Sequence, residues 1–187
     1  MSKMSLKDFL DGYNAVEGLK ITYIRNAIKE DYVPISTKIG VATQMVKNAI
    51  KKEDGVDALD ETVLFINFCM AALLLYTNID ISSADGAMGV LGNYDLLKQN
   101  GALDALMDEM DSINDLKEFN VIYHQVADTE RAKINNPAYI ASSMLMEITG
   151  ALNDGLLKLA DTVEHMDEKK LISKLDLFKK EIQKVIK

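Results

Sequence analysis

The clearest feature of the chain is a pair of long segments in which apolar residues recur at helical spacing. From Asp115 to Ile134 they form one stripe, made of Leu116, Phe119, Tyr123, Val126 and Ala127. From Pro137 to His165 a longer row is predicted to point inward, made of Ile140, Met144, Leu145, Ile148, Leu152, Leu159, Val163 and Met166. Apolar residues three and four positions apart share one face of an α-helix. The pattern therefore predicts two long amphipathic helices.

A third segment is apolar on nearly every side. The stretch from Glu61 to Tyr76 contains the longest apolar run of the chain, which starts at Val63 and is interrupted only by Asn67. A helix without a polar face is expected to be central and surrounded by other helices, and Asp60 is placed to cap it. The run is too short to cross a membrane, which needs about 20 apolar residues. No membrane partner is therefore expected.

Weaker patterns predict the first third of the chain. A helix is expected over Ser5 to Asn14, with Ser5 as its cap. Lys20 to Ile24 suits a short strand or part of a helix that reaches Ile28, and we favour the helix. Ser36 to Lys52 is predicted to be an amphipathic helix, followed by a loop from Lys51 to Asp57. Its inward residues are expected to be Ile39, Ala42, Met45, Val46, Ala49 and Ile50.

Glycine and polar residues dominate the segment from Thr77 to Gly92, which predicts a long connection with one short helical turn. A brief helix is expected from Tyr94 to Gln99. Asn100-Gly101 suits the left-handed end of such a helix. A further helix is then predicted over Ala102 to Met110.

The last segment, Glu168 to Lys187, has a different apolar period. Its apolar positions step by four, three, four and three, which is typical of the seam of a coiled coil. Fewer than three heptads rarely form a stable helix alone, so this segment must pack on its own domain or on another chain. The predicted interaction residues are Leu171, Leu175, Phe178, Ile182 and Val185.

Together these elements predict an all-α fold: an irregular multi-helix bundle with a central apolar helix and a C-terminal amphipathic seam helix. Two domains are expected, a helical domain over residues 1–166 and the seam helix over residues 167–187. A single cysteine, Cys69, and the lack of an apolar leader in the first 20 residues favour a reducing, intracellular compartment.

Charge is distributed unevenly along the chain. The net charge is −8. The last 21 residues carry seven lysines against four acids, or +3, so the preceding 166 residues carry −11. An acidic body lacks the phosphate-neutralising surface that nucleic-acid binding requires. Direct binding to nucleic acid is therefore not expected.

None of the familiar catalytic constellations is complete in this sequence. His124 and His165 are the only histidines and lack the spacing of a zinc or di-iron helix motif. Cys69 lies in the most apolar helix, where an inert thiol is expected. The glycines at 86, 89 and 92 do not match a nucleotide-binding loop. We therefore expect neither an enzyme nor a bound cofactor or metal.

One acidic row has two interpretations. Asp104, Asp108, Asp111 and Asp115 step by four, three and four, which places them along one side of a helix. Such a row can bind a cation, but unpaired carboxylates favour water. A solvated helix face is the expected outcome.

Three stretches in order carry a resemblance: YVPISTK (Tyr32 to Lys38), LLLYTNIDI (Leu73 to Ile81) and YDLLKQNGALD (Tyr94 to Asp104). Over about residues 20–165 the chain resembles small acidic helical proteins encoded by tailed bacteriophages and prophages of Gram-positive bacteria. None of the three motifs is a catalytic signature. The resemblance gives no functional residue to carry over.

The resemblance implies a non-catalytic phage protein that acts through protein–protein contacts. The first hypothesis is a virion structural or assembly component of the head, neck or tail, with other phage proteins or further copies as partners. It would occupy the host cytoplasm during assembly and then the virion. The alternative is a host-directed inhibitor, whose acidic surface occupies the basic groove of a defence protein or nucleic-acid-binding protein.

Overall fold

The computed structural model describes residues 3–53, 56–81 and 89–164. It is 75% helical, with eight helices and only small strands in the described residues, so the predicted all-α fold is confirmed. The chain divides into two units, Met1–Asn136 and Pro137–Lys187, and each is described by itself. The predicted boundary between residues 166 and 167 lies outside the described residues. No helix in the described ranges is both long and apolar enough to cross a membrane.

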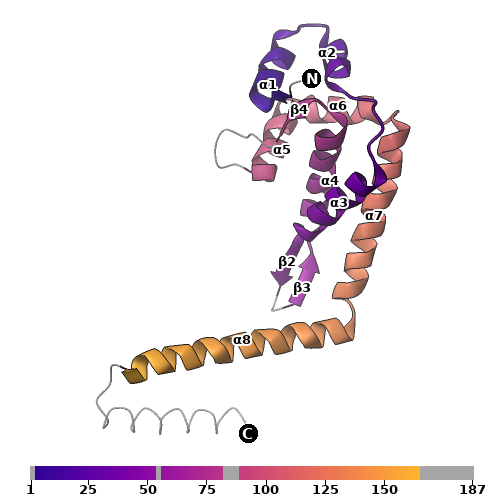
Figure 1. The fold of residues 1–187 in the computed structure, drawn as a ribbon. Helices are drawn as coiled ribbons and strands as arrows, with labels where there is room; N and C mark the ends of the chain where they lie inside the picture. Colours follow the sequence, from indigo (N-terminus) through magenta and orange to yellow (C-terminus); the bar gives the residue numbers. More distant parts are fainter. Residues whose placement is uncertain (1–2, 54–55, 82–88, 165–187) are drawn as a thin grey trace. The chain divides into compact units, whose positions relative to one another are not determined.

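The apolar segment forms the central helix of the first unit, as predicted. Helix α4 covers Glu61–Tyr76, and the side chain of Asp60 caps it by accepting hydrogen bonds from two backbone N–H groups of its first turn. It contacts α3 (Ile35–Lys47), α5 (Gly89–Gln99) and α7 (Asn114–Ile134), which Figure 1 shows around it. Its fully or almost fully buried apolar residues are Leu64, Cys69, Met70, Ala71, Ala72, Leu73 and Tyr76.

Two short helices and a strand pair close one end of this unit. Helix α1 covers Leu6–Ala15 with Ser5 as its N-cap, and α2 covers Lys20–Ala27, as the preferred interpretation predicted. Strand β1 (Met4–Ser5) pairs in parallel with β4 (Ile79–Asp80). This pairing ties the start of the chain to the residues that follow α4. The segment predicted as a plain connection from Thr77 therefore begins with a strand.

The helix predicted over Ser36 to Lys52 is wrong at its C-terminal end. Helix α3 ends at Lys47, and β2 (Ile50–Glu53) then pairs antiparallel with β3 (Val56–Leu59). Ile50 continues the apolar spacing of the helix, but in the structure it pairs with Leu59 across the hairpin. Periodicity in one segment cannot reveal a partner in the next strand, and the predicted loop from Lys51 is therefore mostly strand.

Helices α5 and α6 follow the second gap in the described residues. Helix α5 begins at Gly89, five residues before the predicted start, because Gly92 is tolerated inside the helix. Gly101 has a φ of 68° and so ends α5 in the left-handed conformation that was predicted. Helix α6 covers Ala102–Met110, as predicted. Buried Asn93 donates from Nδ2 to the carbonyl of Ile81 at 2.8 Å, which fixes α5 to the residue after β4.

The predicted apolar stripe of α7 faces the core. Leu116, Phe119, Tyr123 and Ala127 are buried, and Val126 is partly buried. The hydroxyl of Tyr123 donates to the carbonyl of Leu64 on α4 at 2.9 Å. This stripe therefore joins α7 to the central helix by apolar packing and by a buried hydrogen bond.

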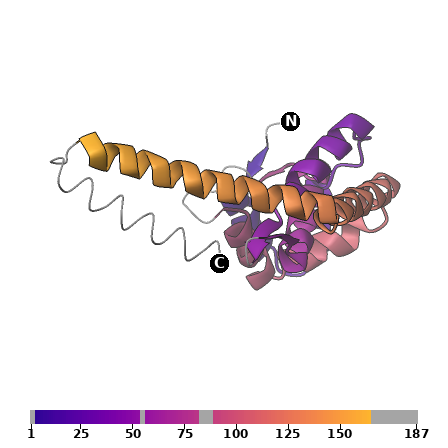
Figure 2. The ribbon, with the colours of Figure 1, turned by 90° about the horizontal axis from the view of Figure 1, so that it is seen from below.

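The second unit contributes one described element, α8 (Pro137–Glu164), which Figure 2 shows along its length. Its bounds agree with the prediction, but the predicted inward row does not lie inward. Met144, Leu145, Ile148 and Leu152 are between 45% and 64% exposed, and Ile140 is half-buried. The side chains of Leu159, Val163 and Met166 lie outside the described residues. An apolar row can be buried only if another element covers it. Within the described residues this unit has no second helix or strand to do so.

Candidate functional site

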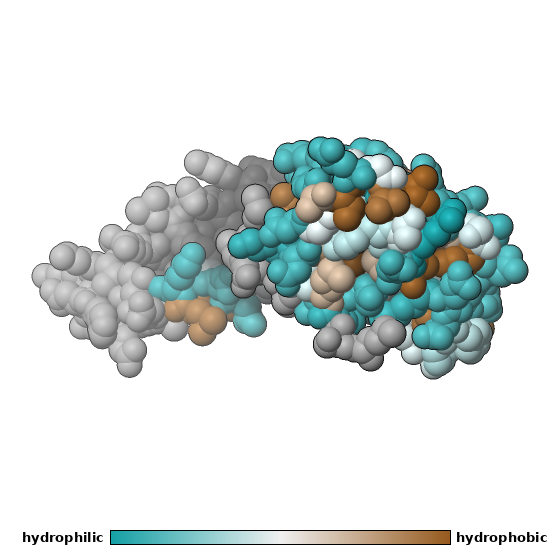
Figure 3. Space-filling model, turned by 90° about the horizontal axis from the view of Figure 1, so that it is seen from above, coloured by the Kyte–Doolittle hydropathy of each residue, from teal (hydrophilic) through white to brown (hydrophobic). Residues whose placement is uncertain are grey.

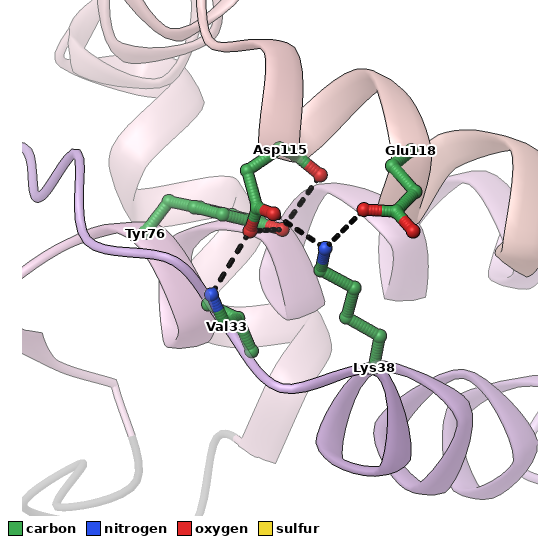
Figure 4. A network of polar contacts seen from close by, with 5 residues as sticks. All are labelled: Val33, Lys38, Tyr76, Asp115 and Glu118. Carbon is green, nitrogen blue, oxygen red and sulfur yellow. Dashed lines mark hydrogen bonds and ion pairs between the residues drawn. The ribbon is translucent and has the colours of Figure 1, made fainter.

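The predicted interaction residues of the seam, Leu171, Leu175, Phe178, Ile182 and Val185, lie outside the described residues, and so does His165. The site chemistry that the structure does describe lies in the first unit, where α3, α4 and α7 meet. There a lysine is fully buried among acidic and phenolic groups. The group is called the Lys38 cluster below; its members are Val33, Lys38, Tyr76, Asp115 and Glu118 (Figure 4).

Lys38 is the cation of this cluster. Its Nζ donates to Oδ1 of Asp115 at 2.5 Å and to Oε2 of Glu118 at 2.8 Å. The same ammonium lies 4.9 Å from the centre of the Tyr32 ring, within the range of a cation–π contact. The lysine side chain is fully buried, whereas that of Glu118 is 48% exposed. The pair therefore joins α3 to α7 through a charge that has lost its contact with water.

Asp115 is the acceptor at the centre of the cluster. Its Oδ2 accepts a hydrogen bond from the hydroxyl of Tyr76 at 2.9 Å and another from the backbone N–H of Val33 at 3.1 Å. These donors come from α4 and from the segment before α3, so one carboxylate holds three parts of the chain (Figure 4). Asp115 also lies in the first turn of α7, where the helix dipole favours a negative charge.

The pKa values of the cluster move in the directions that keep Lys38 and Asp115 charged and Tyr76 neutral. Burial lowers the pKa of Lys38, but its hydrogen bonds to the two carboxylates outweigh burial and leave the pKa raised. Burial raises the pKa of Asp115, but the hydrogen bonds from its three donors outweigh burial and leave the pKa lowered. Burial, followed by Asp115, raises the pKa of Tyr76. A general acid or base works best with a pKa near the working pH, so these shifts suit a structural role.

A cleft adjoins the cluster on its solvent side. It measures about 530 Å³ and is lined by Glu30, Tyr32, Ser112, Ile113, Asn114, Asp115 and Glu118. The carboxylates of Asp115 and Glu118 already bind Lys38. Glu30 is exposed on its rim. The cleft is thus the open side of an ion-pair cluster that fixes how α3 and α7 meet.

Sequence reasoning missed the Lys38 cluster for an identifiable reason. Lys38 precedes Ala42 and Val46 by four and eight residues, so all three share one face of α3, and all three are buried. The predicted inward face instead included Ile39, which is 47% exposed. A lysine in step with buried apolar residues is the feature that could have indicated the pair. Asp115 was assigned to a solvated row because its partners are distant in sequence.

The remaining predicted candidates are dispersed. Asp104, Asp108 and Asp111 are exposed, so three members of the acidic row form the expected solvated face, and Asp104 pairs with Lys98 at 2.5 Å. Asp115 departs from that prediction. In the ranges that the structure covers, no three His, Cys, Asp or Glu side chains are placed to hold a metal ion.

His124 and Cys69 both lie near the aromatic part of the core. His124 is exposed on α7, with its ring centre 6.4 Å from that of Phe68. Cys69 is buried in α4, and burial raises the pKa of its thiol to about 11. A thiol with so high a pKa holds its proton at neutral pH, and the thiolate is the reactive form. The buried thiol therefore fits the predicted core role.

Apolar side chains also reach the surface of both units. In the first unit they emerge as separate patches among hydrophilic residues (Figure 3). On α8 they are denser: Met144, Leu145, Met146, Ile148, Leu152, Leu156 and Leu157 are all between 45% and 76% exposed. Contiguous exposed apolar surface is typical of a surface that contacts another protein or segment.

Comparisons with known proteins add no family to this description. The chain matches no protein-family model, no curated protein and no solved structure.

Proposed function

We propose that the protein is a non-catalytic phage protein that acts through protein–protein contacts, as a virion structural or assembly component of the head, neck or tail. The resemblance of the three motifs between Tyr32 and Asp104 supports the phage origin. The partners are other phage proteins or further copies of the chain. The protein then occupies the host cytoplasm during assembly and the virion afterwards.

The exposed apolar surface of α8 is the observation that carries this proposal. Seven large apolar side chains are exposed between Met144 and Leu157, within 14 residues. Burying one such side chain contributes about 1.5–3 kcal/mol, so a partner that covers only Met146 and Leu157 already gains about 3–6 kcal/mol. The Lys38 cluster, by contrast, has a structural role: it holds α3 and α7 of the first unit in a fixed arrangement.

Mass spectrometry of purified particles tests the proposal. The protein should be found in the particles, and deletion of its gene should reduce the yield of intact particles. A double variant, Met146→Glu with Leu157→Glu, should lower incorporation at least tenfold. The matched control, Gln99→Glu with Asn120→Glu, adds the same charge at exposed positions of the first unit and should be incorporated normally. Absence from particles, together with normal assembly after deletion, would contradict the proposal.

A second candidate function is a host-directed inhibitor with an acidic surface. The exposed carboxylates of Asp108 and Asp111 favour it, because they form a negative face on and just after α6, beside Asp104, which pairs with Lys98. Such a face competes with nucleic-acid phosphates for a basic groove. Pull-down from host lysate should then recover a nucleic-acid-binding protein that added DNA or RNA displaces. Recovery of phage proteins alone would favour the first candidate.

A further inference from the structure

Helix α8 presents two apolar surfaces rather than one. At 3.6 residues per turn, Met144, Leu145, Ile148, Leu152 and Leu156 share one side, called the wide face here. Met146 and Leu157 lie about 140° from the middle of the wide face and form a side patch. All seven side chains are exposed. One partner helix cannot cover both surfaces, so they call for two occupants.

We infer that the wide face is the docking site of the chain's own C-terminal segment, residues 167–187, which lies antiparallel on α8 of the same molecule. This inference rests on the proposed function in one respect. The side patch, Met146 and Leu157, stays free to bind the partner that the proposed function requires. Three observations select this occupant over a second copy or a foreign helix: apolar spacing, reach and charge.

The apolar spacing of the two surfaces agrees. The seam residues of the segment step by four, three, four and three from Leu171 to Val185. On the wide face, Leu145, Ile148, Leu152 and Leu156 step by three, four and four. Both rows are stripes of large apolar residues, which is the pattern that interlocks when two helices pack side by side.

The segment also has the right reach. Only residues 165 and 166 separate the last described residue of α8 from the start of the segment, and helix connections this short place neighbours antiparallel. A returning helix of 20 residues is about 30 Å long, which covers α8 back to about Ile148. A short tether also gives the segment an effective concentration in the millimolar range. A separate molecule at micromolar concentration cannot match that.

Net charge distinguishes the segment from a second copy of α8. Helix α8 carries four acids against Lys158, or −3, whereas residues 167–187 carry seven lysines against four acids, or +3. Two α8 helices would bring −3 against −3. Opposite net charges attract across a helix pair, whereas like charges oppose it. The segment is therefore the favoured occupant on charge as well as on reach.

The antiparallel arrangement specifies a register. With the turn centred near residue 167, Phe178 lies opposite Leu156, Ile182 opposite Leu152, and Val185 opposite Ile148. Three of the five seam residues predicted from the sequence then have defined partners on a helix of the same chain. The side patch lies outside this contact.

Disulfide trapping in the purified full-length protein tests the inference. The variant Leu152→Cys with Ile182→Cys should form a disulfide under mild oxidation, because facing positions on packed helices bring Cβ atoms within bonding range. The expected product is a monomer that has lost two titratable thiols. The control, Asp154→Cys with Ile182→Cys, places the first thiol on the opposite side of α8 and should form at least tenfold less. Native Cys69 is buried and interferes with neither variant.

Two results would overturn the inference. A disulfide-linked dimer as the main product would assign the wide face to a second copy. Equal trapping in the test and control variants would mean that the segment has no fixed place on α8.

A second measurement works without new cysteines. Phe178→Asp should speed amide hydrogen exchange in α8 at least tenfold, whereas Lys179→Asp should change it little. Equal effects of the two variants would also overturn the inference. Both experiments use the protein alone, so their failure is distinct from failure of the side-patch variants to reduce incorporation into particles.

Discussion

Helices α4 and α8 are both rich in large apolar residues, yet most of these side chains are covered in α4 and exposed in α8. In α4 the apolar side chains are buried by α3, α5 and α7, and Phe65 is the one exposed large apolar side chain among its residues. In α8, seven large apolar side chains between Met144 and Leu157 are exposed. The apolar content of a helix therefore indicates that its surface is stabilised by burial, but it does not identify the element or partner that buries it.

Removing one large apolar side chain from each helix gives the clearest comparison. Leu73 of α4 is fully buried, so Leu73→Ala should lower the free energy of unfolding of the first unit by about 2–5 kcal/mol. The matched change on α8, Met146→Ala, removes a side chain that is 76% exposed and should change stability by less than about 0.5 kcal/mol. Urea denaturation followed by circular dichroism measures both. Equal losses would mean that the side patch is already covered in the free protein.

The Lys38 cluster tests whether charge, as well as apolar packing, holds the first unit together. Lys38→Met keeps most of the stem but leaves Asp115 without its cation. The expected loss is about 3 kcal/mol, at the low end for a broken buried pair because Glu118 remains half exposed. Lys133→Met is the control: its pair with Glu130 is at the surface, where such pairs contribute about 0–1 kcal/mol.

A double variant shows how much of that loss in stability comes from the unpaired carboxylate of Asp115. Lys38→Met with Asp115→Asn removes both charges and should be more stable than Lys38→Met alone. If Lys38→Met costs no more than Lys133→Met, or if the double variant recovers nothing, the ion pair does not stabilise the α3–α7 contact.

The pH dependence follows from the two pKa shifts. The pKa of Asp115 in the folded protein lies below its ordinary value of 3.8, so its contribution is complete above that pH and is lost as pH falls through the folded pKa. The pKa of Lys38 lies above 10.5, so its contribution is complete below pH 10.5 and is lost as pH rises through the folded pKa. The cluster therefore contributes fully between about pH 4 and pH 10.

Asp115→Asn provides the measurement. At pH 7 the variant should be less stable than the wild type, and the gap should narrow as the pH is lowered toward 2. A gap that stays constant over this range would show that protonation of Asp115 has no part in acid unfolding.

A structural feature could be predicted from the sequence when the residues that determine it lie close together along the chain. The bounds of α4 and α6 were predicted because Asp60 and Gly101 mark them locally. The burial of Lys38 could not be predicted, because its hydrogen-bond acceptors lie on α7, 77 and 80 residues away in sequence. Ile50 was placed in α3 for a similar reason: its partner, Leu59, is in the next strand. The seam residues from Leu171 to Val185 lie outside the described residues and remain a prediction.

The smallest expected effect concerns the glycines of α8, which α4 lacks. A Cβ added at Gly150 or at Gly155 meets no atom within 4 Å in the structure. Alanine is favoured over glycine inside a helix by about 0.5–1 kcal/mol, so Gly150→Ala should stabilise α8 by that amount and slow its hydrogen exchange. Gly155 lies on the wide face, where the C-terminal segment is inferred to approach. Gly155→Ala should therefore gain less than Gly150→Ala, and equal gains would mean that nothing packs closely at Gly155.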